Sequence, residues 1–463
     1  MQLPEQFAAY ITQVCDQLRW KKARPVIQRE METHLCDQYD AFVKSGIPED
    51  TAVEETLRRT GDAVEIGTGL DRVHRPKPSW GLLILTGILL LMGLAIKLFF
   101  TYDSDFPHEL PTMLVASVLG IGCLFGAYFM DFTLLGRWPL LVYMGAVALV
   151  LLGMLPGMPR FYGRSYYAIQ FSLVLPVAFA ALLYKLRGKG YRGMLLAFGG
   201  LAAESICCML IPAMTGLLPV AVNGVALLIV AVRGDWFRVG KKQGSILLTI
   251  CAAIGTALVV LRLVNSAYFM QRLTTAFHPE IDPYGNGFVG MIVRALLSGA
   301  KLLGTGTTGE YISAPPFIEQ PEFLLTLLIH RVGWISFFVI MAVYALFFTL
   351  AVRKCMKQKN MLGRMVSLSV ILTLAMQTVI YVAYNLGIIL IEGIALPLIS
   401  YGNTALVVNM ALIGIMLSTF RTGSLVRDET SVAHRSKVWQ HIKDRVHWND
   451  GELTISFKKK LAS

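Results

Sequence analysis

The sequence is poor in charged residues. Only 16% of its 463 residues are Asp, Glu, Lys or Arg, whereas 55% are hydrophobic. Since an ordinary soluble domain has about 25% charged residues, this composition excludes a chain that is soluble along its whole length. The hydrophobic residues gather in runs of about 20, which is the length of a helix that spans a bilayer. The sequence therefore predicts a polytopic membrane protein.

The sequence also lacks a cysteine framework. Its 7 cysteines are odd in number and lie in apolar runs or in segments that we place in the cytosol. Disulfides are rare in that compartment, and no Cys and His spacing typical of a metal site is present. The first residues show no charged-then-apolar pattern with a cleavage site, so we expect no signal peptide.

The net charge of +12 is the feature that would point to nucleic acid. The Lys and Arg residues fall in short segments between apolar runs, however, and the positive-inside rule accounts for them there. We therefore expect the membrane, and no nucleic acid, among the partners.

Three parts are expected along the chain. Residues 1–78 carry apolar residues at helical spacing and predict a small cytosolic helical interaction module, residues 79–420 predict an all-α membrane domain, and residues 421–463 predict a basic cytosolic tail. About ten transmembrane helices fit the membrane domain. Their approximate ranges are 79–100, 111–131, 138–156, 167–186, 193–212, 215–233, 244–264, 323–352, 364–389 and 394–419.

Basic residues predict the orientation of these spans. Arg72, Arg75 and Lys77 precede the first span and favour a cytosolic N-terminus, and every second loop from there is the more basic one. Ten spans then place both termini in the cytosol and the long loop of residues 265–322 outside it. Nine spans would place the basic tail outside, against the charge rule.

The 265–322 loop has predicted structure of its own. A turn cluster at 282–287 precedes the run 288–303, whose apolar spacing predicts a helix at the membrane surface with Arg294 and Lys301 at its polar edge. Either phospholipid headgroups or a pyrophosphate would suit these two cations, and headgroups are the more usual partners of such a helix.

Glu322 follows a proline-rich approach and stands at the mouth of the predicted eighth span. A carboxylate there has enough access to water to ionise, and the nearby apolar surroundings can shift its pKa. It is a candidate for catalysis, although an acidic residue at the end of a span serves more often as an interfacial anchor.

Several polar residues fall inside predicted spans, where they are costly and therefore informative. Glu204 is a candidate for function, and an ion pair with a cation such as Arg262 is the structural alternative. Asn and Ser side chains near the last two spans would either line a groove or pack helices. The residues to be placed are Glu204, Arg262, His330, Arg331, Asn385, Glu392, Ser400, Asn403 and Asn409.

The order of motifs around the long loop resembles that of a known family. FHPEIDPYGNGF, SGAKLLGTG, PEF and ALPLISYGNTALVVNM follow one another, and the sequence is similar to the SEDS family of FtsW, RodA and SpoVE over about residues 80–425. Residues 33–67 in turn resemble a three-helix module found ahead of some bacterial permeases and sensor proteins. Residues matching the family motifs DPxGxGY, GxG and PLPxxSYGG are Asp282, Gly304, Gly306, Ser400, Tyr401 and Gly402.

This resemblance implies a bacterial cytoplasmic-membrane protein that polymerises lipid II by glycosyl transfer in division, elongation or sporulation. It implies Glu322 as the catalytic carboxylate, in place of an Asp of the family, and a class B penicillin-binding protein as partner. A divalent cation would suit the pyrophosphate, but no dedicated ligand cluster is visible. The residues that it places near the substrate are Asp282, Arg294, Lys301, Gly304, Gly306, Ser400, Tyr401 and Gly402.

The sequence departs from the family at several positions. Glu322 is one methylene longer than the family's Asp, and Leu175 and Ala178 replace a Glu and a Lys before the fourth span. A shift of about 1 Å at a catalytic group can lower a rate roughly a hundredfold. These departures favour an alternative, a catalytically impaired homologue that acts as a scaffold or binds the lipid-linked precursor. The motifs that are kept favour the polymerase.

Overall fold

The computed structural model describes residues 4–103, 109–161, 164–211, 214–307, 321–390, 395–400, 402–423, 446–449 and 452–455. The chain divides into two compact units. One holds residues 1–78 together with 421–463, and the other holds residues 79–420.

Residues 4–78, as described, contain four α-helices rather than the three suggested by the resemblance. Gly61 ends the third helix with a φ of 97°, and the Asp62 side chain then accepts hydrogen bonds from two backbone N–H groups to start the fourth. Buried apolar side chains centred on Phe7 and Leu35 join the helices. The elements are α1 (Glu5–Asp16), η1 (Lys21–Ala23), α2 (Arg24–Lys44), α3 (Glu49–Thr60) and α4 (Ala63–His74), with a hairpin of β3 (Val446–Asn449) and β4 (Glu452–Ile455) farther along the chain.

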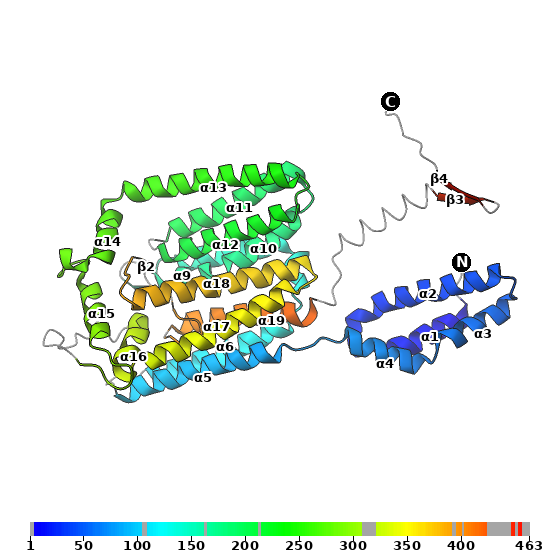
Figure 1. Cartoon of the computed structure of the whole chain (residues 1–463), viewed down its shortest axis with the longest axis horizontal. Coiled ribbons are helices and arrows are strands. Elements are labelled where there is room, and N and C mark those ends of the chain that lie inside the picture. The colour runs from blue at the N-terminus through cyan, green and yellow to red at the C-terminus, as the bar shows by residue number, and fades with distance from the viewer. Residues whose placement is uncertain are drawn as a thin grey trace, which may run out of the picture. The chain divides into compact units, whose positions relative to one another are not determined.

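The second unit is a bundle of apolar helices, as expected of a multi-pass membrane protein (Figure 1). Among the described residues, nine helical segments are long and apolar enough to cross a membrane. They are α5 (Trp80–Asp103), α6 (Glu109–Phe129), α9 with α10 (Tyr166–Ser172 and Leu175–Leu186), α11 (Gly190–Met209), α12 (Met214–Arg233), α13 (Lys241–Val264), α17 (Trp334–Met356), α18 (Met361–Asn385) and α19 (Asn403–Thr422).

The predicted third span is a shorter apolar helix, α8 (Pro139–Gly153), which follows the single turn of α7 (Thr133–Arg137). Its 15 residues rise about 22 Å, less than the roughly 30 Å of a bilayer core. A small hairpin of β1 (Arg160–Phe161) and β2 (Arg164–Ser165) joins α8 to α9. The all-α polytopic fold is thus confirmed, with nine full-length segments and this shorter helix in the described residues.

The predicted eighth span is wrong as a single helix. It consists of η3 (Pro321–Phe323) and α16 (Leu324–Val332), then a break at Gly333, then α17. Gly333 has a φ of 112°, and a Cβ atom there would lie 2.5 Å from the Leu302 carbonyl oxygen. Only glycine accepts both this conformation and this close approach, so the helix turns at this position.

Two other predicted boundaries are also wrong. The tenth span begins at α19, because residues 395–400 form a buried turn in which Leu398 has a φ of 69°. The surface helix ends at Ser298 as α15 (Phe288–Ser298), five residues early. Beyond it, Gly299 lies against the Thr307 backbone, and its carbonyl accepts from the Thr307 N–H at 3.0 Å.

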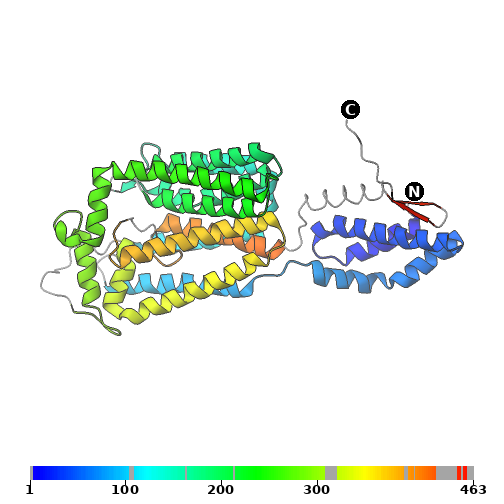
Figure 2. The ribbon, with the colours of Figure 1, turned by 45° about the horizontal axis from the view of Figure 1, so that its top comes forward.

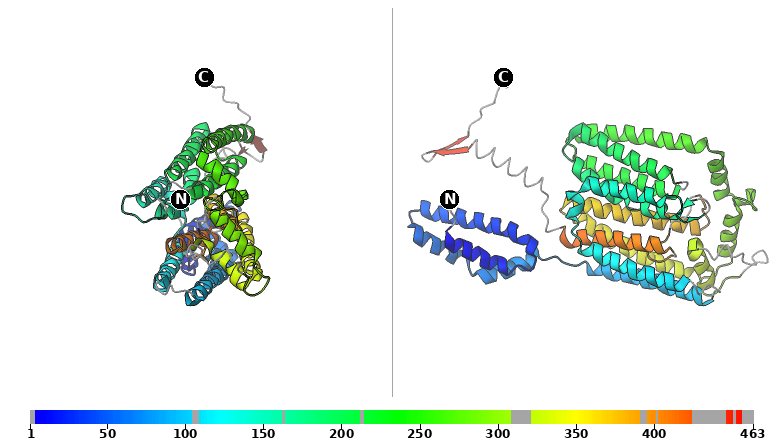
Figure 3. Two further views of the ribbon diagram at one scale, coloured as in Figure 1. Left: turned by 90° about the vertical axis from the view of Figure 1, so that its left-hand side faces the viewer. Right: turned by 180° about the vertical axis from the view of Figure 1, so that it is seen from behind.

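The long loop also contains a helix that the sequence did not predict, α14 (Ala267–Phe277), followed by η2 (Pro279–Ile281). Together α14 and α15 cross one end of the bundle (Figure 2). Two further views place α18 among the other helices and α13 at the periphery (Figure 3). This arrangement brings the end of α18 next to η3, where Glu322 lies.

Candidate functional site

Glu322 lies in η3 and is half-buried. Its backbone carbonyl accepts a hydrogen bond of 2.9 Å from Asn385 Nδ2, and its Oε2 atom accepts one of 3.4 Å from the Tyr384 hydroxyl. The next residue, Phe323, stacks on Tyr384 with ring centroids 5.0 Å apart. The end of α18 therefore holds both the backbone and the side chain of Glu322.

Asn385 is the centre of this arrangement. Its Oδ1 atom accepts hydrogen bonds from the Thr326 backbone N–H at 3.0 Å and from the Thr326 hydroxyl at 3.1 Å, and both residues are fully buried. The Thr326 hydroxyl also lies 2.8 Å from the Asn385 carbonyl oxygen. These contacts satisfy an orphan N–H of the first turn of α16 and a terminal carbonyl of α18, so the two helix ends are fixed to each other.

Two further tyrosines, Tyr166 at the start of α9 and Tyr381 on α18, lie within electrostatic range of the Glu322 carboxylate. Gly402 lies next to the Tyr166 hydroxyl, since a Cβ atom there would lie 3.3 Å from the Tyr166 oxygen. Phenol hydroxyls donate hydrogen bonds to carboxylates. The Tyr384 hydroxyl donates to Glu322 in this way, whereas Tyr381 is hydrogen-bonded with Asn385 and Ser400.

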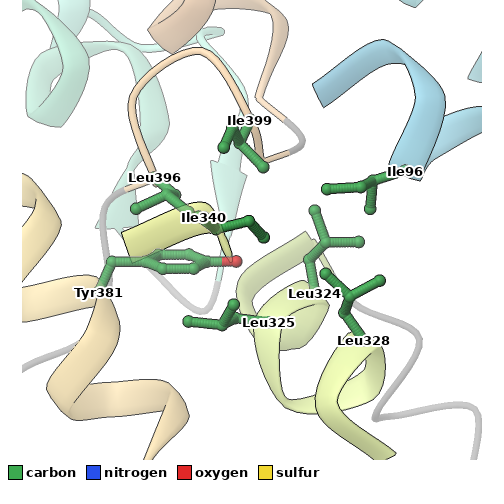
Figure 4. A pocket seen from close by; sticks show the side chains of 8 residues that line it. All are labelled: Ile96, Leu324, Leu325, Leu328, Ile340, Tyr381, Leu396 and Ile399. Atoms are coloured by element: carbon green, nitrogen blue, oxygen red, sulfur yellow. The ribbon is translucent and has the colours of Figure 1, made fainter. Parts of the chain in front are cut away.

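A small apolar pocket adjoins the site between α5, α16, α17, α18 and the 395–400 turn (Figure 4). The Tyr381 ring lies along it with the hydroxyl directed toward the leucines of α16. Every other lining side chain is aliphatic. It is lined by Ile96, Leu324, Leu325, Leu328, Ile340, Tyr381, Leu396 and Ile399.

Arg294 is engaged elsewhere in the long loop. Its guanidinium donates hydrogen bonds of 3.1 and 3.0 Å to the carbonyls of Ala276 and Phe277, at the C-terminal end of α14. Cations suit the carbonyls at a helix end, so Arg294 joins α14 to α15. Nearby, the pKa of the Glu280 carboxyl is lowered by its own backbone N–H and by His278, 3.0 Å away.

Lys301 and the two predicted glycines lie in a segment that runs along α16. The Gly304 N–H donates to the Val332 carbonyl at 2.9 Å, the Gly306 N–H donates to the His330 carbonyl at 2.7 Å, and the Lys301 carbonyl accepts from the Trp334 N–H at 3.1 Å. The Lys301 side chain is exposed. It does not lie on α15, so the predicted position at a helix edge is wrong for this residue.

Asp282 and Ser400 each close a turn. One Asp282 carboxylate oxygen accepts from the Asn286 N–H at 2.9 Å, and the Ser400 hydroxyl accepts from the Leu396 N–H at 2.8 Å. The structure therefore gives both residues a structural role, while Gly402 lies beside Tyr166. Tyr401 and Glu392 lie outside the described residues.

The polar residues within the spans have different surroundings. Glu204 is fully buried, and its carboxylate has no hydrogen-bond partner among the described residues, while Arg262 is exposed on α13. The predicted ion pair between them is therefore wrong. His330 Nδ1 lies 3.1 Å from the Leu296 carbonyl oxygen, and the Arg331 guanidinium lies 5.5 Å from the centre of the Phe100 ring.

The described residues contain no group of three or more His, Cys, Asp or Glu side chains that could hold a metal ion.

Sequence reasoning singled out Glu322 and missed the tyrosines around it. Tyr381 and Asn385 do share a signal, since both follow the four-residue spacing that places side chains on one face of a helix. Tyr166 has no such signal, because its position depends on how α9 packs against α8 and α12 and on the approach of Gly402.

A family model described as "Cell cycle protein" and covering FtsW, RodA and SpoVE matches residues 79–423; the first 78 residues lie outside that match. The chain is 24% identical to stage V sporulation protein E of Bacillus subtilis (strain 168), over 75% of this chain and 98% of that protein. It is also 24% identical to a probable peptidoglycan glycosyltransferase FtsW of Trichlorobacter lovleyi, over 62% of this chain and 77% of that protein.

Solved structures have the same fold. A structure described as "Structural coordination of polymerization and crosslinking by a peptidoglycan synthase complex" contains a chain with a TM-score of 0.58 and 18% identity, over 74% of this chain and 98% of that one. The rod shape determining protein RodA of Thermus thermophilus gives a TM-score of 0.51 and 16% identity, over 76% of this chain and 98% of that one.

Proposed function

Because this chain belongs to the FtsW, RodA and SpoVE family of membrane proteins, we propose that it polymerises lipid II by glycosyl transfer during bacterial cell-wall synthesis. The observation that carries the proposal is the half-buried Glu322 near an apolar pocket, with its carboxylate accepting from Tyr384 and its backbone carbonyl accepting from Asn385. Relatives named peptidoglycan glycosyltransferases support the reaction type.

The proposed reaction needs one proton acceptor. The acceptor hydroxyl gives its proton to the Glu322 carboxylate while its oxygen bonds to the anomeric carbon of the donor sugar. The bond from that carbon to the lipid pyrophosphate breaks, and the pyrophosphate leaves with the electron pair. A positioned general base of this kind contributes about 10² to 10⁴ in rate.

The family membership also supports proposals for the location of the protein, its partner and a counter-ion. The protein would lie in the bacterial cytoplasmic membrane with both termini in the cytosol, where the 1–78 helices would form an interaction module. The solved peptidoglycan synthase complex supports a cross-linking partner, for which we propose a class B penicillin-binding protein. A divalent cation would suit the pyrophosphate as a counter-ion.

A second candidate function is a scaffold that binds the lipid-linked precursor without polymerising it. The position of the cations favours it, because the Arg294 guanidinium is hydrogen-bonded to two backbone carbonyls and the Lys301 side chain projects from a separate segment. Neither cation has a described contact with Glu322.

The test is lipid II polymerisation by the purified protein, alone and with its candidate transpeptidase, for wild type, Glu322→Gln and Glu322→Asp. Glu280→Gln is the matched control, because Glu280 is an exposed acid of the same loop. We expect glycan chains from wild type and the control, and a rate lower by about 10² or more for Glu322→Gln. If wild type binds lipid II and forms no chains in any condition, the scaffold replaces the polymerase.

A further inference from the structure

We propose that Tyr166, Tyr167 and Phe171 form an aromatic sugar-binding surface beside Glu322. The proposal rests on the function proposed above and names the part of the ligand that this surface takes, a pyranose ring of the lipid-linked saccharide.

The three rings form a continuous aromatic strip on α9. Tyr167 and Phe171, one helical turn apart, are stacked with centroids 6.1 Å apart and an interplanar angle of 22°. The Tyr166 ring meets the Tyr167 ring edge to face at 5.7 Å. All three side chains are only partly buried, so packing in the bundle core does not cover their rings completely.

The strip begins at the candidate base. The Tyr166 hydroxyl lies beside Gly402, where a Cβ atom would lie 3.3 Å from its oxygen, and it is within electrostatic range of the Glu322 carboxylate. We therefore expect a sugar held on the strip to lie toward the carboxylate that accepts its proton.

The chemistry of the strip matches a sugar better than a lipid chain. A pyranose ring presents an apolar C–H face and a rim of hydroxyls, whereas tyrosine presents an apolar ring and one hydroxyl. Tyrosines at the end of a span also anchor proteins in lipid headgroups. Tyr166, however, lies beside Gly402 and within electrostatic range of Glu322, so this end of the strip lies toward the site.

The experiment measures the affinity of the purified full-length protein for two ligands, lipid II and undecaprenyl pyrophosphate, which lacks the saccharide. We expect Tyr167→Leu and Phe171→Leu each to weaken lipid II binding about tenfold, a loss typical of one aromatic contact. Both variants should bind undecaprenyl pyrophosphate as wild type does. Tyr167→Phe keeps the ring and should retain most of the affinity for lipid II.

The matched control is Phe125→Leu on α6. Phe125 stacks on Phe129, also four residues along its helix, with ring centroids 6.4 Å apart and the same interplanar angle of 22°. Both of these rings are exposed on the bundle surface, at 48% and 67%. This control should leave both affinities unchanged. If the Leu variants on α9 lose affinity for both ligands equally, the strip is a lipid anchor and the proposal fails. Unchanged affinity for lipid II would also overturn it.

The outcome is separable from that of the polymerase test. Wild type that binds lipid II without forming chains, together with selective loss in the Leu variants, would contradict the polymerase and support the sugar surface. Chain formation by wild type, with lipid II affinity unaltered in both Leu variants, would support the polymerase and contradict the sugar surface.

Discussion

Two long helices of the membrane unit, α13 and α18, differ in how much of their surface is buried. None of the membrane-spanning window of α13 is buried, whereas 67% of the corresponding window of α18 is. The exposed face of α13 is aliphatic, with Ile250, Ile254 and Leu258 at four-residue intervals. This face suits lipid, and no other described helix needs it for packing.

The buried face of α18 is polar at the same four-residue interval. The members of this polar column are Ser369, Thr373, Gln377, Tyr381 and Asn385. Four of these side chains contact different parts of the bundle, through the fully buried Asn223 of α12, Asn409 of α19, Ser400 of the turn before α19, and Thr326 of α16. The fifth, Ser369, donates to the Val366 carbonyl within α18, and its own backbone carbonyl accepts from Asn223. Polar groups inside a membrane bundle are costly unless paired, so the column specifies how these elements meet around Glu322.

The largest effect is expected where the column ends. Asn385→Ala removes the amide that joins α18 to Glu322 and Thr326, leaving buried groups unpaired at a cost of roughly 3 kcal/mol. A displaced Glu322 should lower lipid II polymerisation about a hundredfold. Thermal unfolding and polymerisation in detergent measure the two effects. Thr249→Val, on the exposed face of α13, is the control. If both variants show the same thermal unfolding and the same polymerisation rate, α18 has no special role.

A smaller effect is expected in the middle of the column. Gln377 and Asn409 exchange amide hydrogen bonds of 3.1 and 3.2 Å. Replacing either one with Leu leaves its partner unpaired, at a cost of roughly 2 kcal/mol. Replacing both should cost less than the sum of the single changes, because no unpaired amide remains. Strict additivity in a double-mutant cycle of unfolding free energies would show that the pair is not a unit.

The contact of Tyr384 with the carboxylate should affect pH dependence more than stability. Tyr384→Phe keeps the ring stacked on Phe323 but removes the hydroxyl that donates to Glu322. Since that donor favours the ionised carboxylate, its loss should move the acid limb of the pH–rate profile to higher pH. An unmoved limb, with an equal loss of rate at every pH, would mean that Tyr384 serves packing alone.

The smallest effect is expected on α13. Ile254 is 56% exposed, so Ile254→Ala should change the unfolding free energy by no more than about 0.5 kcal/mol and leave polymerisation unchanged. A loss of unfolding free energy comparable with that of Gln377→Leu would show that the outer face of α13 packs against another protein. The exposure of α13 would then reflect a missing partner and not contact with lipid.

The sequence predicted the helices and their order because runs of apolar residues are a local signal. It failed where a boundary depends on a distant segment. The break at Gly333 follows from the approach of Leu302, and the turn before α19 is buried among other helices. Glu322 was found as an acid at the end of a span. Its partners Asn385 and Tyr166 come from other parts of the chain, and only packing brings them together.

The most direct test of the central claim is the rate of glycan-chain formation from lipid II by Glu322→Gln, measured beside wild type and Glu280→Gln at equal protein and lipid II concentrations. The account predicts chains from wild type and Glu280→Gln, and loss of about 10² or more in rate for Glu322→Gln. A Glu322→Gln protein that polymerises as fast as wild type would contradict the assignment of Glu322 as the base.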